Sequence, residues 1–224
     1  MNTSFIKMEA KNCVKGHRFT LLKPYLLIWI ISYAISVLFS FLAISDIGIN
    51  TLATMDYESA ISMVSSSKIM TISSIVSVLI TSPLQYGLIQ YYNFFENGNT
   101  PTLGIVFNPI RYVIKIFVMT VFINIMTSIG FSFLIIPGLI ISCAFSIVPF
   151  VYSKHLDVGI MEMLSHAWRM MRGHKMEYLF LELSFIGWYL VGLITFGIGL
   201  LWVLPYHEMT LVKYFNKLEE AYVS

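Results

Sequence analysis

Long apolar runs, separated by short polar segments, make up most of this chain. A helix that crosses the hydrocarbon core of a bilayer needs about 20 mostly apolar residues. Runs of this kind lie at residues 24–45, 69–95, 110–134, 136–152, 178–194 and 198–215. The pattern predicts an all-α fold, namely a polytopic membrane helix bundle with about six transmembrane helices. We expect residues 1–224 to form a single integral membrane domain.

Two short segments predict turns between consecutive helices. The segment Ile135-Ile136-Pro137-Gly138 indicates a turn between the third and fourth helices. Gly192, Gly197 and Gly199 around Thr195 indicate a turn between the fifth and sixth. The alternative, one long helix in place of the last two, would exceed the length that one crossing needs.

The positions of the basic residues predict the orientation. In the six-helix arrangement every Lys and Arg except Lys68 falls on one side of the membrane. Because positively charged loops remain in the cytoplasm, both termini are expected there, in a multi-pass protein of the cell membrane. Residues 46–68 are then the one sizeable external segment, expected to be a flexible loop or a short helix.

An internal repeat accompanies this pattern. Lys15-Gly16-His17-Arg18 precedes the first helix and Arg172-Gly173-His174-Lys175 precedes the fifth. Amphipathic segments, at residues 1–22 and 157–175, include these elbows near their C-terminal ends and are expected to lie at the cytoplasmic interface. The sequence therefore predicts duplicated hairpins, each introduced by an interfacial helix and a basic-Gly-His-basic elbow.

The second amphipathic segment has an expected orientation. Asp157 is a candidate N-cap and Gly173 a candidate C′ residue of this helix. Its apolar face is predicted to contain Ile160, Met161, Leu164, Trp168 and Met171.

Small hydroxylated residues recur every four positions on the first two membrane helices. These stripes are Ser32, Ser36 and Ser40, and Ser73, Ser77 and Thr81. Such stripes let helix backbones approach closely in lipid. Helix packing is the favoured interpretation, and a hydroxyl-lined polar pathway is the alternative.

Composition agrees with a membrane protein. The chain is 57% hydrophobic and 12% charged, with a mean hydropathy of +0.77, whereas soluble domains carry about 25% charged residues. A net charge of +2 and the lack of a basic stripe give no reason to expect nucleic acid as a partner. Cys13 and Cys143 are expected to be free thiols, because their positions do not favour a disulfide.

Three ionisable residues within the apolar runs form a candidate intramembrane polar site: Glu182, His207 and Glu208. Ionisable groups at such positions often mark ion or proton pathways. The alternative is local pairing or snorkelling near the interface. No catalytic motif or metal-ligand spacing occurs, so we expect no enzyme activity, no cofactor and no metal.

The last part of the chain resembles a bacterial integral membrane family known as domain of unknown function 975 (DUF975). The matching positions include Ile135-Ile136-Pro137-Gly138, Arg172-Gly173-His174-Lys175, Leu183-Ser184-Phe185-Ile186-Gly187-Trp188, Gly197-Ile198-Gly199, Leu201-Trp202 and Pro205-Tyr206. The resemblance implies a multi-pass bacterial membrane protein and a structural motif of Pro137, Gly138, Gly173, His174, Gly187, Trp188, Pro205 and Tyr206. It implies no reaction or substrate.

Three functional hypotheses remain. The first is a non-enzymatic protein whose partners are the lipid bilayer and other membrane proteins, for example in bacteriocin immunity, export or envelope stress. The second is a small-solute or ion transporter or channel that uses Glu182 and Glu208. The third, an enzyme acting on lipid, lacks an acid–base pair and has the least support.

Overall fold

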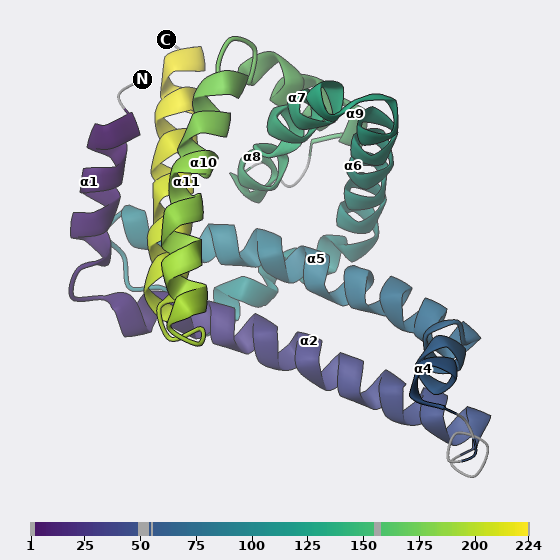
Figure 1. The fold of residues 1–224 in the computed structure, drawn as a ribbon. Helices are drawn as coiled ribbons and strands as arrows, with labels where there is room; N and C mark the ends of the chain where they lie inside the picture. Colours follow the sequence, from purple (N-terminus) through teal and green to yellow (C-terminus); the bar gives the residue numbers. More distant parts are fainter. Residues whose placement is uncertain (1–2, 49–53, 55, 155–157, 224) are drawn as a thin grey trace.

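The computed structural model describes residues 3–48, 54, 56–154 and 158–223, and every regular element in these ranges is helical (Figure 1). By length and composition, five stretches could cross a membrane. They are α2 (Arg18–Ile47), α5 (Lys68–Glu96), η1 with α6 (Leu103–Tyr112 and Val113–Phe133), α7 with α8 (Ile135–Phe145 and Val148–Lys154), and α10 (Lys175–Ile194). The all-α prediction is confirmed, and five of the six predicted spans qualify.

The sixth predicted span is the central helix of the molecule. This helix, α11 (Leu200–Val223), packs against α1, α2, α5, α9 and α10. Its C-terminal half carries Lys213, Lys217 and Glu219, which make it too polar to be counted among the apolar spans. These charges pair with neighbouring helices instead, as Lys213 does with Glu96 at 3.1 Å.

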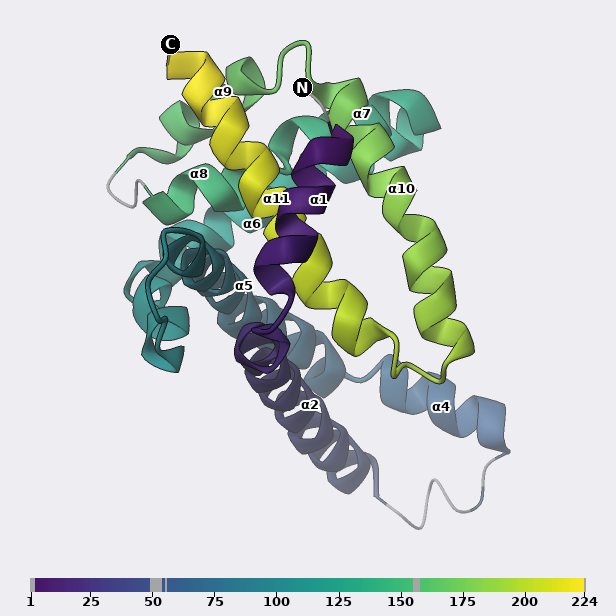
Figure 2. The same cartoon turned by 90° about the vertical axis from the view of Figure 1, so that its left-hand side faces the viewer.

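The N-terminal helix α1 (Thr3–Val14) lies along α11, as Figure 2 shows. Ile6, Ala10 and Val14 are buried, and their spacing of four residues puts them on one face. The ion pair between Glu9 and Lys217 joins the same two helices. The predicted amphipathic segment therefore exists, and its apolar face is buried against protein.

The first hairpin consists of α2 and α5, which run side by side (Figure 1). Between them, Asp56 caps α4 (Tyr57–Ser65) by accepting a hydrogen bond from the Ser59 N–H at 3.1 Å. The predicted external segment thus contains a short helix, while residues 49–53 and 55 lie outside the described residues. In the serine stripes, Ser73 is buried whereas Ser36 is exposed, and the Thr81 hydroxyl donates to Ser77 O of its own helix at 2.7 Å.

The predicted turn at residues 135–138 is wrong in position. The chain reverses at Leu134, which has an extended backbone, and Pro137 and Gly138 lie in the first turn of α7. Proline is tolerated there because the first N–H groups of a helix need no partner within it. A Cβ on Gly130 would lie 3.0 Å from Gly138 Cα, so the two glycines allow α6 and α7 to approach closely.

The helix α9 (Ile160–Met170) also corrects the sequence prediction. Its buried residues are Met163, Leu164, Ala167 and Met170, whereas Met161 is 71% exposed and Trp168 41% exposed. The buried face is rotated because α9 packs on α7, α8 and α11 rather than on one flat surface. Gly159 occupies the N-cap position, and Asp157 lies outside the described residues.

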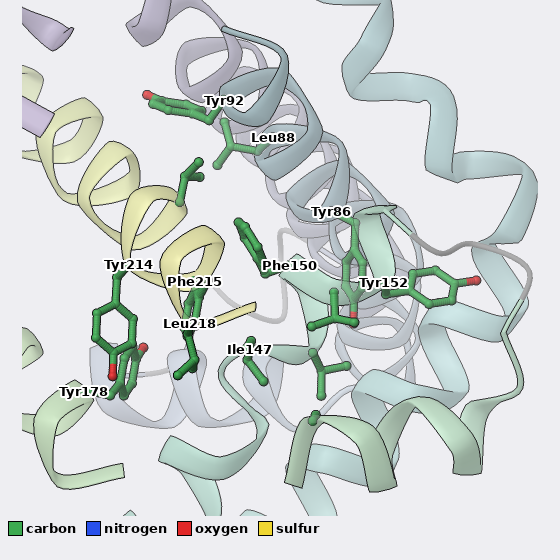
Figure 3. Close-up of a cluster of buried hydrophobic side chains, with 14 of the residues drawn as sticks. Tyr86, Leu88, Tyr92, Ile147, Phe150, Tyr152, Tyr178, Tyr214, Phe215 and Leu218 are labelled. Carbon is green, nitrogen blue, oxygen red and sulfur yellow. The ribbon is translucent and has the colours of Figure 1, made fainter. Parts of the chain in front are cut away.

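Aromatic side chains from distant segments fill the core beside α11 (Figure 3). The Phe215 ring lies 5.4 Å from the Phe150 ring and 5.5 Å from the Tyr178 ring, measured between centroids. Tyr86 and Tyr152 meet edge to face at 5.6 Å. These contacts connect α5, α8, α10 and α11 into one cluster.

The two predicted elbows have the same backbone geometry. Gly16 has a φ of 94° and Gly173 a φ of 87°, in the left-handed region that glycine favours. The histidine after each glycine precedes a long helix, and its N–H donates to a carbonyl three residues back, Val14 O at 3.1 Å or Met171 O at 3.2 Å. The predicted C′ position of Gly173 is wrong by one residue, because the C-cap of α9 is Met171 and Gly173 follows it by two.

One contact near the first elbow is not expected from the predicted topology. The Arg18 guanidinium lies 3.7 Å from the centroid of a Trp202 ring, so the start of α2 is next to the start of α11. The six-helix arrangement would put Arg18 and the turn that precedes α11 on opposite sides of the membrane. That turn itself is confirmed, because α10 ends at Ile194 and α11 begins at Leu200.

Candidate functional site

Two of the three predicted polar residues meet between α10 and α11. His207 Nε2 lies 3.0 Å from Glu182 Oε2. The Tyr178 hydroxyl, one helical turn before Glu182, donates to Glu182 Oε1 at 2.7 Å. Both carboxylate oxygens therefore have a partner, and the His207 side chain is only 12% exposed.

The third residue, Glu208, faces a different helix. It interacts with the hydroxyl of Tyr25 from α2. The Tyr25 ring contacts Tyr92 of α5 with a centroid distance of 6.3 Å. Because adjacent helix residues point about 100° apart, His207 and Glu208 connect α11 to two neighbours in different directions.

Lys7 of α1 brings a positive charge to the edge of this group. Its ammonium donates to the Ser184 hydroxyl and lies 4.4 Å from the centroid of the Phe185 ring. The same Phe185 ring contacts the His207 ring edge to face at 4.7 Å. Partial burial lowers the pKa of the Lys7 amine.

This arrangement is suited to holding helices together. Every polar atom of the Glu182 carboxylate is satisfied, and His207 is enclosed by the rings of Phe185 and Tyr189. Within the described ranges, no three of His, Cys, Asp and Glu gather in a way that could hold a metal ion. We call Tyr178, Glu182, His207, Glu208 and Tyr25 the polar cluster.

The structural-motif residues predicted from the sequence lie in three places. Pro137 and Gly138 lie at the α6–α7 corner, and Gly173 and His174 lie at the second elbow, where His174 Nδ1 is 3.1 Å from Glu177 Oε2. The other residues of the motif lie on the α10–α11 hairpin: Gly187, Trp188, Pro205 and Tyr206. The Trp188 and Tyr206 rings meet edge to face at 6.5 Å.

The sequence prediction missed three residues of this region. Tyr178 had a local signal, since it lies four residues before Glu182 on the same helix and so on the same face. Tyr25 and Lys7 had no local signal. Only the tertiary fold brings Tyr25 of α2 to Glu208 and Lys7 of α1 to Ser184.

A family model described as "Protein of unknown function (DUF975)" matches residues 117–222, from α6 to the end of α11. No curated protein and no solved structure matches the chain.

Proposed function

We propose, from its surface, that this chain is a non-enzymatic, multi-pass membrane protein that acts by binding another membrane helix within the bilayer. The match of residues 117–222 to a family of unknown function assigns no other activity. The exposed face of α2 supports this proposal. Only 6% of the most apolar window of this 30-residue helix is buried within the chain.

Polar and aromatic side chains on α2 favour a protein partner over lipid alone. The Trp29 and Tyr33 rings stack at 5.6 Å with an angle of 11° between their planes, and both side chains are more than 60% exposed. Among the described residues, the Tyr33 hydroxyl has no hydrogen-bond partner. An unpaired hydroxyl in hydrocarbon is costly, and a partner helix with an acceptor would remove this cost.

Site-specific photocrosslinking in native membranes tests the proposal. A benzophenone amino acid at Tyr33 is expected to give a discrete protein adduct, whose mass identifies a second copy or another protein. The control is Leu38, which has a similar exposure of 56% and lies about 140° around the same helix. No protein adduct at Tyr33, or equal adducts at both positions, would contradict the proposal.

The proposed orientation has both termini in the cytoplasm, supported by the basic residues of the two terminal helices, which pack together: Lys7 and Lys11 in α1, and Lys213 and Lys217 in α11. Single cysteines can be placed at residues 60 and 220 after replacement of Cys13 and Cys143 by serine. An impermeant maleimide added to intact cells should label only position 60. Labelling at position 220 would overturn this orientation.

The polar cluster supports one competing function, transport of a proton or a small ion. Ionisable groups within membrane helices often lie on such pathways, and Glu182 and Glu208 reach α2, α10 and α11. In proteoliposomes with a pH-sensitive dye, the binding proposal predicts no flux above that of empty liposomes. A flux that the wild type shows and that Glu182→Gln or Glu208→Gln loses would contradict the binding proposal and support transport.

A further inference from the structure

A small cavity lies where the first elbow meets the α10–α11 hairpin. Its volume is about 160 Å³. One wall is apolar and consists of Trp188, Trp202, Val203 and Tyr206. The first elbow and its flanking helices contribute Lys11, Val14 and Arg18, so the lining combines aromatic rings with two cations.

The two cations at this cavity have no acidic partner among the described residues. Elsewhere in the described residues, Lys154, Lys213 and Lys217 each form an ion pair with a glutamate. Arg18 instead stacks on Trp202 at 3.7 Å and is half-buried. This stacking fixes the plane of the guanidinium and leaves its N–H donors available to an anion.

The chemistry of the walls selects an amphiphilic anion. Guanidinium and ammonium groups bind phosphate oxygens. Indole and phenol rings favour the region where lipid headgroups meet acyl chains. The apolar surface continues past Trp188 to Val191, one helical turn further along α10 and 51% exposed. An acyl chain could lie along this surface, whereas a free phosphate would leave the aromatic wall unused.

We propose that this cavity binds the headgroup of an anionic phospholipid. The phosphate contacts Arg18 and Lys11, and the first carbons of the acyl chain lie against Trp188, Trp202 and Tyr206. The proposal is independent of the partner proposed for α2, because the cavity lies at the first residue of this helix, about 22 Å along its axis from Tyr33. It would give the first elbow a fixed depth in the membrane.

Native mass spectrometry of the purified, delipidated full-length protein tests this site. The probes are phosphatidylglycerol, phosphatidylcholine and inorganic phosphate, each titrated separately. Phosphatidylglycerol is expected to bind about tenfold more tightly than phosphatidylcholine, and Arg18→Gln should weaken its binding about fivefold, as expected for the loss of one basic contact to an anionic lipid. Arg18→Lys should restore part of the binding.

Lys23→Gln is the matched control, since Lys23 lies on the same helix, is exposed and is not part of the cavity. It should bind phosphatidylglycerol as the wild type does. If Arg18→Gln and Lys23→Gln weaken phosphatidylglycerol binding equally, the effect is one of overall charge and the proposed site is wrong. Competition by inorganic phosphate at the same concentration as the lipid would assign the cavity to a free anion instead.

A second variant separates binding from folding. Trp188→Leu keeps both cations and an apolar surface, and it should weaken phosphatidylglycerol binding while the melting temperature stays within a few degrees of the wild type. If both Arg18→Gln and Trp188→Leu bind the lipid normally, the proposal is wrong.

Discussion

The N-terminal unit, composed of α1, α2 and α5, and the C-terminal unit, composed of α9, α10 and α11, share one backbone plan but are held together by different side chains. In both units a glycine of positive φ and a histidine join an amphipathic helix to a long one. In both, a tyrosine of the last helix donates to a carbonyl near this elbow: Tyr91 to Thr20 O at 2.9 Å, and Tyr214 to His174 O at 3.3 Å.

The interiors of the two units differ at equivalent positions. Eight residues after the elbow histidine, the N-terminal unit has Tyr25 and the C-terminal unit has Glu182. Tyr25 contacts Glu208 of the other unit, whereas Glu182 pairs with His207 inside its own unit. The repeated backbone geometry therefore depends on a few local residues. The polar side chains in the interiors of the two units differ.

The two units meet at another pair of equivalent residues. Asn216 Nδ2 of α11 donates to Asn93 Oδ1 of α5 at 3.3 Å, and both asparagines follow an aromatic pair. Contact between equivalent residues is the sign of a local twofold relation. The surroundings are unequal, because Asn216 also bonds to Lys154 and Glu96.

The largest expected effect is at Gly87 of α5. A Cβ at this position would overlap the backbone of Val106 in η1, which cannot move aside as a side chain could. Gly87→Val should lower the free energy of unfolding by about 3 kcal/mol, or prevent folding.

The equivalent residue of α11 is Thr210, whose hydroxyl donates to Tyr206 O of its own helix. Thr210→Val should lower the free energy of unfolding by only about 1 kcal/mol. Unfolding in detergent measures both variants, and equal losses would contradict the expected difference between the two positions.

The next effect concerns the polar cluster. Glu182→Ala leaves His207 and Tyr178 without their shared partner, and should cost about 2 kcal/mol. Tyr25→Phe at the equivalent position removes one hydroxyl and should cost about half as much. Thermal unfolding in a mild detergent, followed by intrinsic fluorescence, measures both. A larger loss for Tyr25→Phe would show that the two interiors are not organised as described.

The asparagine pair should respond unequally. Asn216→Ala removes contacts to three residues and should cost about 1.5 kcal/mol. Asn93→Ala removes one contact, and should cost about 0.6 kcal/mol, a typical value for a polar contact between membrane helices. The double variant measures their coupling. Similar losses for the two single variants would indicate a symmetric interface.

The smallest effect tests the shared elbow. Gly16→Ala and Gly173→Ala should each cost about 1 kcal/mol, because alanine is disfavoured at positive φ although its Cβ would meet nothing within 4 Å. Gly187→Ala is the control, since Gly187 lies inside α10 without a positive φ and its surroundings are equally open. It should not destabilise the fold, because alanine favours a helix interior more than glycine does. Unequal losses of stability in Gly16→Ala and Gly173→Ala would contradict the view that the two elbows depend on glycine equally.

Local sequence signals were enough to predict the elements that depend on local energy. The apolar runs predicted the helices, because a long uncharged segment satisfies its backbone groups only by forming one. The elbow glycines and the glycines around Thr195 predicted turns, because their conformations are available to glycine at little cost. Even so, the α6–α7 reversal was placed a few residues late, since Pro137 is compatible with both a turn and the first turn of a helix.

The sequence by itself therefore determined the all-α class, the elbows and the set of ionisable residues within apolar runs. Only the tertiary structure decided that α11 lies at the centre, which face of α9 is buried, and that Glu182 meets His207 while Glu208 meets Tyr25. The physical reason is that these outcomes depend on which helices pack together, and in a membrane protein the packing forces are distributed over many weak contacts that no short segment of sequence reveals.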